Sequence, residues 1–146
     1  MKCTAEELKR AMDEFSGGSD ERYRHAFNRK FIYTAGVQKV AELVGAYWLL
    51  DTLALKISPI FAKAWLSNLV GIGIVKLQVF TVAEHAADSK LPAARLSLSL
   101  TDEGPKAYVE DITFTDFPEG ELVLFLGTDE IGPNSYVTTV YLPQEH

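Results

Sequence analysis

Apolar side chains recur at helical spacing over residues 34–56, the longest such run in the chain. At 100° per residue, Val37, Val40 and Val44 fall on one side, which predicts a helix packed on the core. Asp51 falls within the same arc, at about 320° from Val37. The pattern therefore predicts one continuous helix with a carboxylate on its buried face.

An ionised carboxylate is costly to bury unless charged or hydrogen-bonding groups pair with it. The segment before the helix supplies such groups, and we expect Arg24 or His25 to meet Asp51. In one interpretation this contact is purely structural and holds a connecting segment in place, as ion pairs often do. In another, His25 acts as acid or base, Asp51 orients it, and Arg24 and Tyr47 hold an anionic substrate. The candidate catalytic residues are thus His25 and Asp51, and the candidate binding residues are Tyr23, Arg24, Tyr33, Tyr47 and Trp48.

Shorter signals mark other helix boundaries. Thr4 followed by Glu7 has the spacing of a capping box. Ser58 and Pro59 suit the N-cap and first turn of a further helix. Gly45 is unfavourable inside a helix by about 1 kcal/mol, which suggests that another element approaches closely there.

From about residue 74 the apolar side chains recur at every second position, which is typical of strands with one solvent-exposed face. Strands are expected at about 75–79, 96–100, 108–114, 122–126 and 136–142, and a short one is conceivable at 29–33. Successive strands joined by short turns pair as an antiparallel meander. Helices followed by strands predict one α+β domain over residues 1–146, in which N-terminal helices (about 1–70) cover one face of a five-stranded antiparallel meander sheet (about 74–142).

The amino-acid composition limits the kinds of functional site that the chain can form. The 146 residues are 47% hydrophobic and 23% charged, as in a soluble globular protein. Cys3 is the only cysteine and the three histidines are scattered, so we expect neither a disulfide nor a metal site. No phosphate-binding loop or nucleophile motif is present, and we expect no cofactor. The charged opening segment lacks a secretory signal and the apolar runs are too short to span a bilayer, which favours a cytoplasmic protein without membrane partners.

Charge is unevenly distributed along the chain, whose net charge is −6. Residues 1–100 contain 13 Lys and Arg against 10 Asp and Glu, whereas residues 101–146 contain Lys106 alone against 10 acidic residues. The net charge argues against nucleic-acid binding. The acidic half predicts an acidic sheet face, which either serves solubility or attracts a basic partner. Free sheet edges favour a homodimer.

Several segments together resemble a family of small uncharacterised bacterial proteins that are often associated with plasmids or phages. The resemblance is carried by Tyr23–His25, Tyr33–Val37, Gly45–Asp51 (GAYWLLD), Ile112–Pro118 and Tyr141–Pro143. Ala35 and the ending Gln144–His146 depart from the pattern. The resemblance implies a shared fold and no particular activity.

These observations favour a small non-enzymatic binding protein, which would use the acidic sheet face or the central aromatic cluster to hold a protein partner. The alternative is a small enzyme or ligand-binding protein built on Arg24, His25 and Asp51. A third interpretation is structural, in which the same set fastens the N-terminal segment to the core. The three differ in what surrounds Asp51 in the folded chain.

Overall fold

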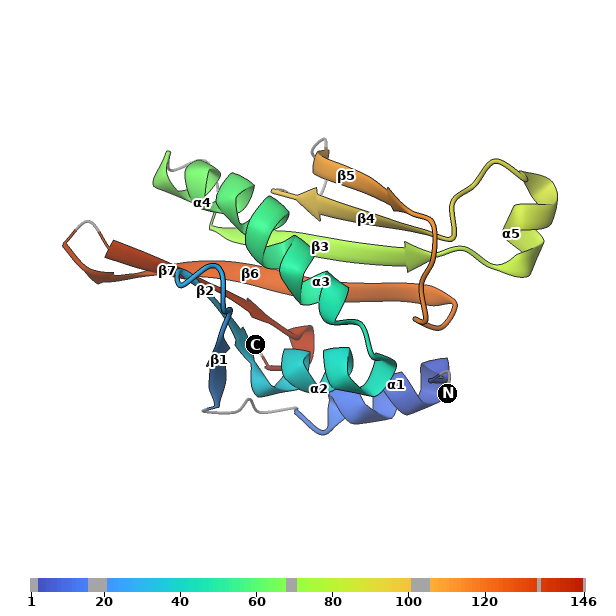
Figure 1. Ribbon diagram of the computed structural model, residues 1–146, viewed down its shortest axis with the longest axis horizontal. Coiled ribbons are helices and arrows are strands. Elements are labelled where there is room, and N and C mark those ends of the chain that lie inside the picture. The colour runs from blue at the N-terminus through green and yellow to red at the C-terminus, as the bar shows by residue number, and fades with distance from the viewer. Residues whose placement is uncertain (1–2, 16–20, 68–70, 101–105, 134, 146) are drawn as a thin grey trace.

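The computed structural model describes residues 3–15, 21–67, 71–100, 106–133 and 135–145. Within these ranges the protein is α+β, with a seven-stranded mixed sheet crossed on one face by helices (Figure 1). The strands are β1 (Arg22–Arg24), β2 (Phe31–Thr34), β3 (Ile72–Val79), β4 (Ala94–Ser99), β5 (Lys106–Ile112), β6 (Gly120–Gly132) and β7 (Ser135–Tyr141). The helical elements are α1 (Ala5–Asp13), α2 (Ala35–Val44), α3 (Tyr47–Thr52), the π-helix η1 (Leu53–Ile57), α4 (Ser58–Leu66), α5 (Val82–Ala87) and the 3-10 turn η2 (Pro143–Glu145).

The strand order corrects the predicted meander. The sheet runs β1-β2-β7-β6-β3-β4-β5, so β6 returns past β4 and β5 to pair with β3. The order β6-β3-β4-β5 is that of a Greek key, in which a fourth strand lies beside the first of three. Alternation fixes which residues form strands, but each strand could pair with any neighbour that buries its apolar face.

The predicted helical region (about 1–70) and the predicted sheet region (about 74–142) are also less separate than expected. β1 and β2 arise within the region predicted to be helical, and β2 pairs in parallel with β7, so the sheet is not purely antiparallel. Conversely, α5 forms between β3 and β4, within the region predicted to contain only the sheet. A complete capping box between Thr81 and Glu84 starts α5, since each side chain accepts the other residue's backbone N–H.

The continuous helix predicted over 34–56 is wrong, because Gly45 ends α2. Gly45 adopts the left-handed conformation with φ 76°, which suits glycine at a helix C-terminus. A Cβ built on Gly45 would meet nothing within 4 Å, so no element approaches closely there. The chain then restarts as α3 at Tyr47 with a new helical phase.

This new phase places Asp51 on the outside and overturns its predicted burial. In α3 and η1 the buried side is formed by Leu49, Leu50, Leu53 and Ala54. Asp51 lies opposite them, and 62% of its side chain is exposed. The angular count that placed Asp51 among the valines assumed an unbroken helix.

From Tyr47 to Leu66 the chain remains helical, but through a π-helical turn. Ser58 N–H bonds to the Leu53 carbonyl, five residues back, as π-helices require. Pro59 comes next and has no N–H, so the carbonyl of Ala54 receives no backbone donor in that register. Ser58 is therefore not the N-cap predicted from the sequence, but a buried residue inside the helix with αR dihedrals.

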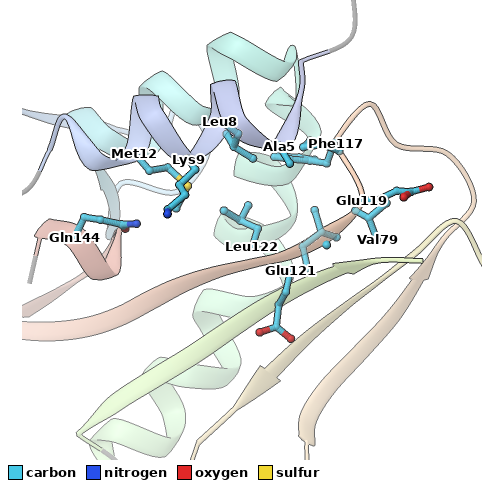
Figure 2. Close-up of a pocket in the computed structure, with 13 residues that line it drawn as sticks. Ala5, Leu8, Lys9, Met12, Val79, Phe117, Glu119, Glu121, Leu122 and Gln144 are labelled. Atoms are coloured by element: carbon cyan, nitrogen blue, oxygen red, sulfur yellow. The ribbon is translucent and has the colours of Figure 1, made fainter. Parts of the chain in front are cut away.

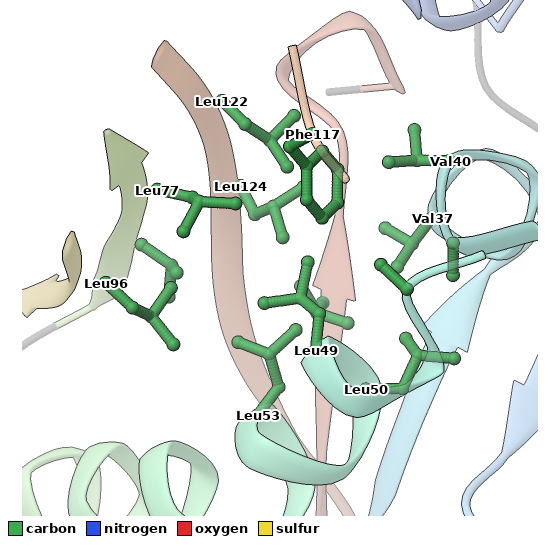
Figure 3. Close-up of a cluster of buried hydrophobic side chains, with 14 of the residues drawn as sticks. Val37, Val40, Leu49, Leu50, Leu53, Leu77, Leu96, Phe117, Leu122 and Leu124 are labelled. Atoms are coloured by element: carbon green, nitrogen blue, oxygen red, sulfur yellow. The ribbon is translucent and has the colours of Figure 1, made fainter. Parts of the chain in front are cut away.

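The core lies between this helical segment and the sheet (Figure 3). Leu49 and Leu53 face Leu77, Leu96 and Leu124 across the interface, and all five side chains are at most 2% exposed. Strand alternation accounts for the sheet side, since β3 buries every second residue from Gly73 to Val79. In the described part of the chain, no helix is long and apolar enough to cross a bilayer.

The face of the sheet opposite the core carries both charges over the described parts of β3–β6, where the sequence predicted an acidic face. A shallow hollow there is lined by three basic residues, Lys76, Arg95 and Lys106, and by the carboxylates Asp111 and Glu121. Arg95 Nε pairs with Asp111 Oδ1 at 2.8 Å. Within this hollow the three cations outnumber the two carboxylates. Dimerisation through the edge strands stays a prediction.

Candidate interaction site around His25 and Asp51

His25 and Asp51 are in contact, although Asp51 is not buried. His25 Nε2 lies 2.8 Å from Asp51 Oδ1. His25 follows β1 and is only 6% exposed, with its ring against those of Phe27 and Phe31. The contact therefore joins a buried imidazole to a solvated carboxylate at the surface of α3.

The hydrogen bonds of His25 define its tautomer. Phe27 N–H donates to His25 Nδ1 at 3.1 Å, so Nδ1 is an acceptor and has no proton. Nε2 then bears the hydrogen and donates it to Asp51. Both ring nitrogens are engaged within the protein, and neither is free to exchange a proton with a substrate.

A second bond fastens the same loop to the helix. Asn28 Nδ2 donates to the Ala54 carbonyl at 2.7 Å, which is the carbonyl that Pro59 leaves without a backbone donor. Asn28 Oδ1 also accepts the Lys30 N–H at 3.0 Å and so holds the loop in shape. The loop between β1 and β2 is thus attached to α3 and η1 at two points, Asp51 and Ala54.

Aromatic side chains surround this attachment. The rings of Tyr23 and Tyr33 stack at 5.6 Å, and the ring of Phe27 lies 6.0 Å from that of His25. Burial raises the pKa of Tyr33, and the charges of Tyr47 and Asp51 raise it further. We define the aromatic patch as Tyr23, Phe27, Tyr33 and Tyr47.

The aromatic patch is accessible from solvent and bordered by carboxylates. Phe27 is 83% exposed, Tyr47 51% and Tyr23 37%. Tyr23 donates its hydroxyl to Glu21 at 3.2 Å, which raises the pKa of Tyr23, and Glu42 adds to the rise. Asp51 is a third carboxylate close to the patch, and Arg22 and Arg24, which flank Tyr23 in β1, project from the opposite face of that strand.

Two of the predicted binding residues lie elsewhere. Arg24 pairs with Ile32 in β2, one position along from the Tyr23–Tyr33 pair, so its side chain projects from the opposite face of these strands. The indole ring of Trp48 makes an edge contact with Phe117 at 6.2 Å, on the side of the core. The proposed set of Arg24, His25 and Asp51 is therefore not assembled around one ligand position. Among the described residues, no group of His, Cys, Asp or Glu is arranged to hold a metal ion.

Comparison with known families matches residues 6–146, nearly the whole chain, to a single family profile. The chain belongs to DUF6876, a family of unknown function. No curated protein and no solved structure matches this DUF6876 chain. Its candidate site must therefore be interpreted from its own residues.

The sequence-based set for the DUF6876 protein omitted Asn28 and Phe27. Asn28 could have been noticed as a turn-forming residue, because asparagine side chains commonly bond backbone groups two residues on. Its partner, the Ala54 carbonyl, has no local signal, since it depends on a π-helical turn. Phe27 gave no signal of exposure, because aromatic residues are usually at least partly buried.

Proposed function

We propose that this DUF6876 protein is a non-catalytic interaction protein whose aromatic patch binds a basic segment of a partner protein. The observation that supports this most directly is the exposure of Tyr23, Phe27 and Tyr47 beside the carboxylates of Glu21, Glu42 and Asp51. Tyrosine is enriched among the residues that dominate binding energy at protein interfaces.

The charge of the surroundings indicates the kind of partner. A guanidinium or ammonium group is attracted to the face of an aromatic ring, and neighbouring carboxylates strengthen that attraction. The patch offers the exposed side chains of Tyr23, Phe27 and Tyr47 together with three carboxylates on β1, α2 and α3 or next to them. An arginine-containing segment fits this combination, whereas an acidic segment would be repelled.

The attachment of the loop supports binding over catalysis. The bonds from His25 to Asp51 and from Asn28 to Ala54 fix the backbone that presents Phe27. A pre-arranged aromatic surface loses little conformational entropy when a partner binds. The alternative acid–base role for His25 requires a free ring nitrogen, and both are engaged.

Peptide titration tests the proposal. A short peptide with alternating arginine and glycine is added to isotope-labelled protein, and NMR shifts are followed at the ring resonances of Tyr23, Tyr33 and Tyr47. We expect saturable shifts confined to the patch. Tyr47→Ala should weaken binding at least about fivefold, because it removes a large exposed part of the contact surface.

Phe114→Ala provides the matched control, since Phe114 is an exposed aromatic residue on the segment between β5 and β6. Its removal should leave the affinity unchanged. A second peptide, with glutamate in place of each arginine, should not bind. Equal responses to the two peptides, or equal losses in Tyr47→Ala and Phe114→Ala, would rule out the aromatic patch as a site for basic segments.

A further inference from the structure

The sheet ends on one side in β5, whose outer edge pairs with no other strand in the described part of the chain. β5 pairs with β4 alone and forms the margin of the sheet (Figure 1). The backbone N–H and C=O groups on its outer side can therefore pair with a further strand. β5 has seven residues, whereas β1 at the opposite edge has three, so β5 is the longer template.

Two of the features that protect edge strands from pairing lie only at the start of β5. Proteins protect such edges with bulges, with charged side chains and with very short strands. In β5 a bulge leaves Ala107 without a partner in β4, and the only cation of the strand is its first residue, Lys106. From Tyr108 to Ile112 the pairing with β4 is regular, and Val109 within this stretch is 53% exposed. The regular part thus presents an apolar side chain at a free edge.

The two carboxylates in the regular part of β5 are each paired with a cation of the same chain. Lys56 Nζ lies 3.1 Å from Glu110 Oε1, and Arg95 Nε lies 2.8 Å from Asp111 Oδ1. A cation beside each carboxylate offsets its charge and so reduces the repulsion between two copies of this edge. The edge therefore has no unbalanced charge that would select a charged partner over a second copy.

The symmetry of a pair of identical strands restricts how two copies of β5 can align. Opposing residues of antiparallel strands project from the same face of a sheet, so the two-fold axis must pass beside one residue, which then faces its own copy. An axis at Glu110 or Asp111 would place two carboxylates directly opposite each other, which is destabilising. An axis at Val109 places valine against valine and Tyr108 against Glu110 of the partner subunit. An axis nearer either end of the regular part would pair fewer residues.

We propose that two copies of this protein associate through β5, antiparallel about a two-fold axis at Val109, so that their sheets join edge to edge. The exposed side chain of Val109 is then buried against its copy, and the outer backbone groups of both strands are hydrogen-bonded. The aromatic patch lies on and beside β1, at the opposite edge of the sheet, so this inference does not depend on the proposed function.

Sedimentation equilibrium tests the association over protein concentrations from about 1 μM to about 1 mM. We expect a monomer–dimer equilibrium. Val109→Asp should raise the dissociation constant of the dimer at least about tenfold, because two carboxylates would then meet at the axis. Ile131→Asp is the matched control, since it adds the same charge at another exposed apolar residue, in β6, and should associate as the unmodified protein does. Thermal unfolding checks that both variants are folded.

A protein that stays monomeric over the whole concentration range would overturn the proposal, and so would equal losses in Val109→Asp and Ile131→Asp. Both outcomes leave the aromatic patch untouched, because its peptide titration reports on different residues.

Cysteine cross-linking tests the alignment in a Cys3→Ala background, which removes the only native thiol. Val109→Cys places the two thiols at the axis, where opposing Cβ atoms are about 4.5–5.5 Å apart, and oxidation should give a covalent dimer. Asp111→Cys is the control, because residue 111 would lie four positions, about 14 Å, from its own copy. Cross-linking of Asp111→Cys as efficient as that of Val109→Cys would overturn the proposed axis.

Methyl NMR locates the interface in the unmodified protein. On dilution the Val109 methyl signals should shift, whereas those of Leu8, Met12 and Leu122 should stay unchanged. These three residues line a cavity of about 240 Å³ beneath α1 (Figure 2). Leu122 is separated from Glu110 by three strand spacings, about 14 Å, so a β5 interface does not reach it. Dilution shifts at the cavity without shifts at Val109 would place the interface elsewhere and contradict the proposal.

Discussion

At the scale of single residues, His25 and Asp51 form an unequal pair. The imidazole is 6% exposed and neutral, with both nitrogens hydrogen-bonded, while the carboxylate is 62% exposed. Desolvation therefore affects mainly an uncharged ring, and Asp51 retains much of its hydration. The contact contributes as one hydrogen bond at the surface and not as a buried ion pair.

Replacing Asp51 should accordingly have a small effect. We expect Asp51→Ala to lower the free energy of unfolding by about 1 kcal/mol, because His25 loses one acceptor that water can partly replace. Burial of the carboxylate would instead have implied a loss of about 3–5 kcal/mol. Urea unfolding measures the difference, with Asp111→Ala as a control at another exposed carboxylate paired with a basic residue. A loss above about 3 kcal/mol would show that Asp51 is buried in solution.

At the scale of elements, the π-helical turn and the β1–β2 loop depend on each other. Pro59 leaves the Ala54 carbonyl without a backbone donor, and Asn28 from the loop supplies one at 2.7 Å. The loop, in turn, is held against the helix by this bond and by His25. A helix irregularity that would be costly alone is thereby stabilised by a loop residue 26 positions earlier in the chain.

A double-mutant cycle tests this dependence. Asn28→Ala should lower the free energy of unfolding by about 1–3 kcal/mol, because a buried carbonyl loses its donor. In a Pro59→Ala background, residue 59 regains an N–H that can bond to Ala54, so the same substitution should cost about 1 kcal/mol less. Chemical denaturation of the four proteins gives the coupling. Additive losses would mean that Asn28 does not compensate for Pro59.

At the scale of the whole molecule, hydrogen bonds join the C-terminal turn η2 to the start of α2. Glu145 Oε1 accepts the Thr34 hydroxyl at 2.6 Å and the Leu142 N–H at 2.9 Å, and Oε2 accepts the Gly36 N–H at 3.4 Å. A Cβ built on Gly36 would lie 2.7 Å from Glu145 Cδ, so only glycine allows this approach. A carboxylate at a helix N-terminus also interacts favourably with the helix dipole.

Loss of the hydrogen bonds of Glu145 should lower the stability of the whole protein. We expect Glu145→Ala to lower the free energy of unfolding by about 2–3 kcal/mol, because Thr34 is buried and three hydrogen bonds disappear. Glu145→Gln, which retains an acceptor, should lose less. Glu119→Ala serves as the control at an exposed glutamate and should change stability by no more than about 0.5 kcal/mol. Thermal unfolding at neutral pH would contradict the expectation if Glu145→Ala melted with the unmodified protein.

The sequence by itself determined the local elements. Alternating apolar residues placed all five later strands close to β3–β7, because the two faces of a strand meet different surroundings. The Thr4 cap of α1 was also predictable, since its hydroxyl accepts the N–H of Glu7 three residues on. The contact of His25 with Asp51 was one of the two pairings expected, although the burial of Asp51 from which it was inferred is absent.

The tertiary structure alone decided the strand order, the helical phase after Gly45 and the membership of the candidate site. Strand order depends on the return of β6 to β3, and no local pattern specifies that partner. The side on which Asp51 lies depends on a break at one glycine, after which the earlier angular count no longer applies. The attachment of Asn28 to Ala54 exists only because a distant loop reaches a carbonyl that a proline left unpaired.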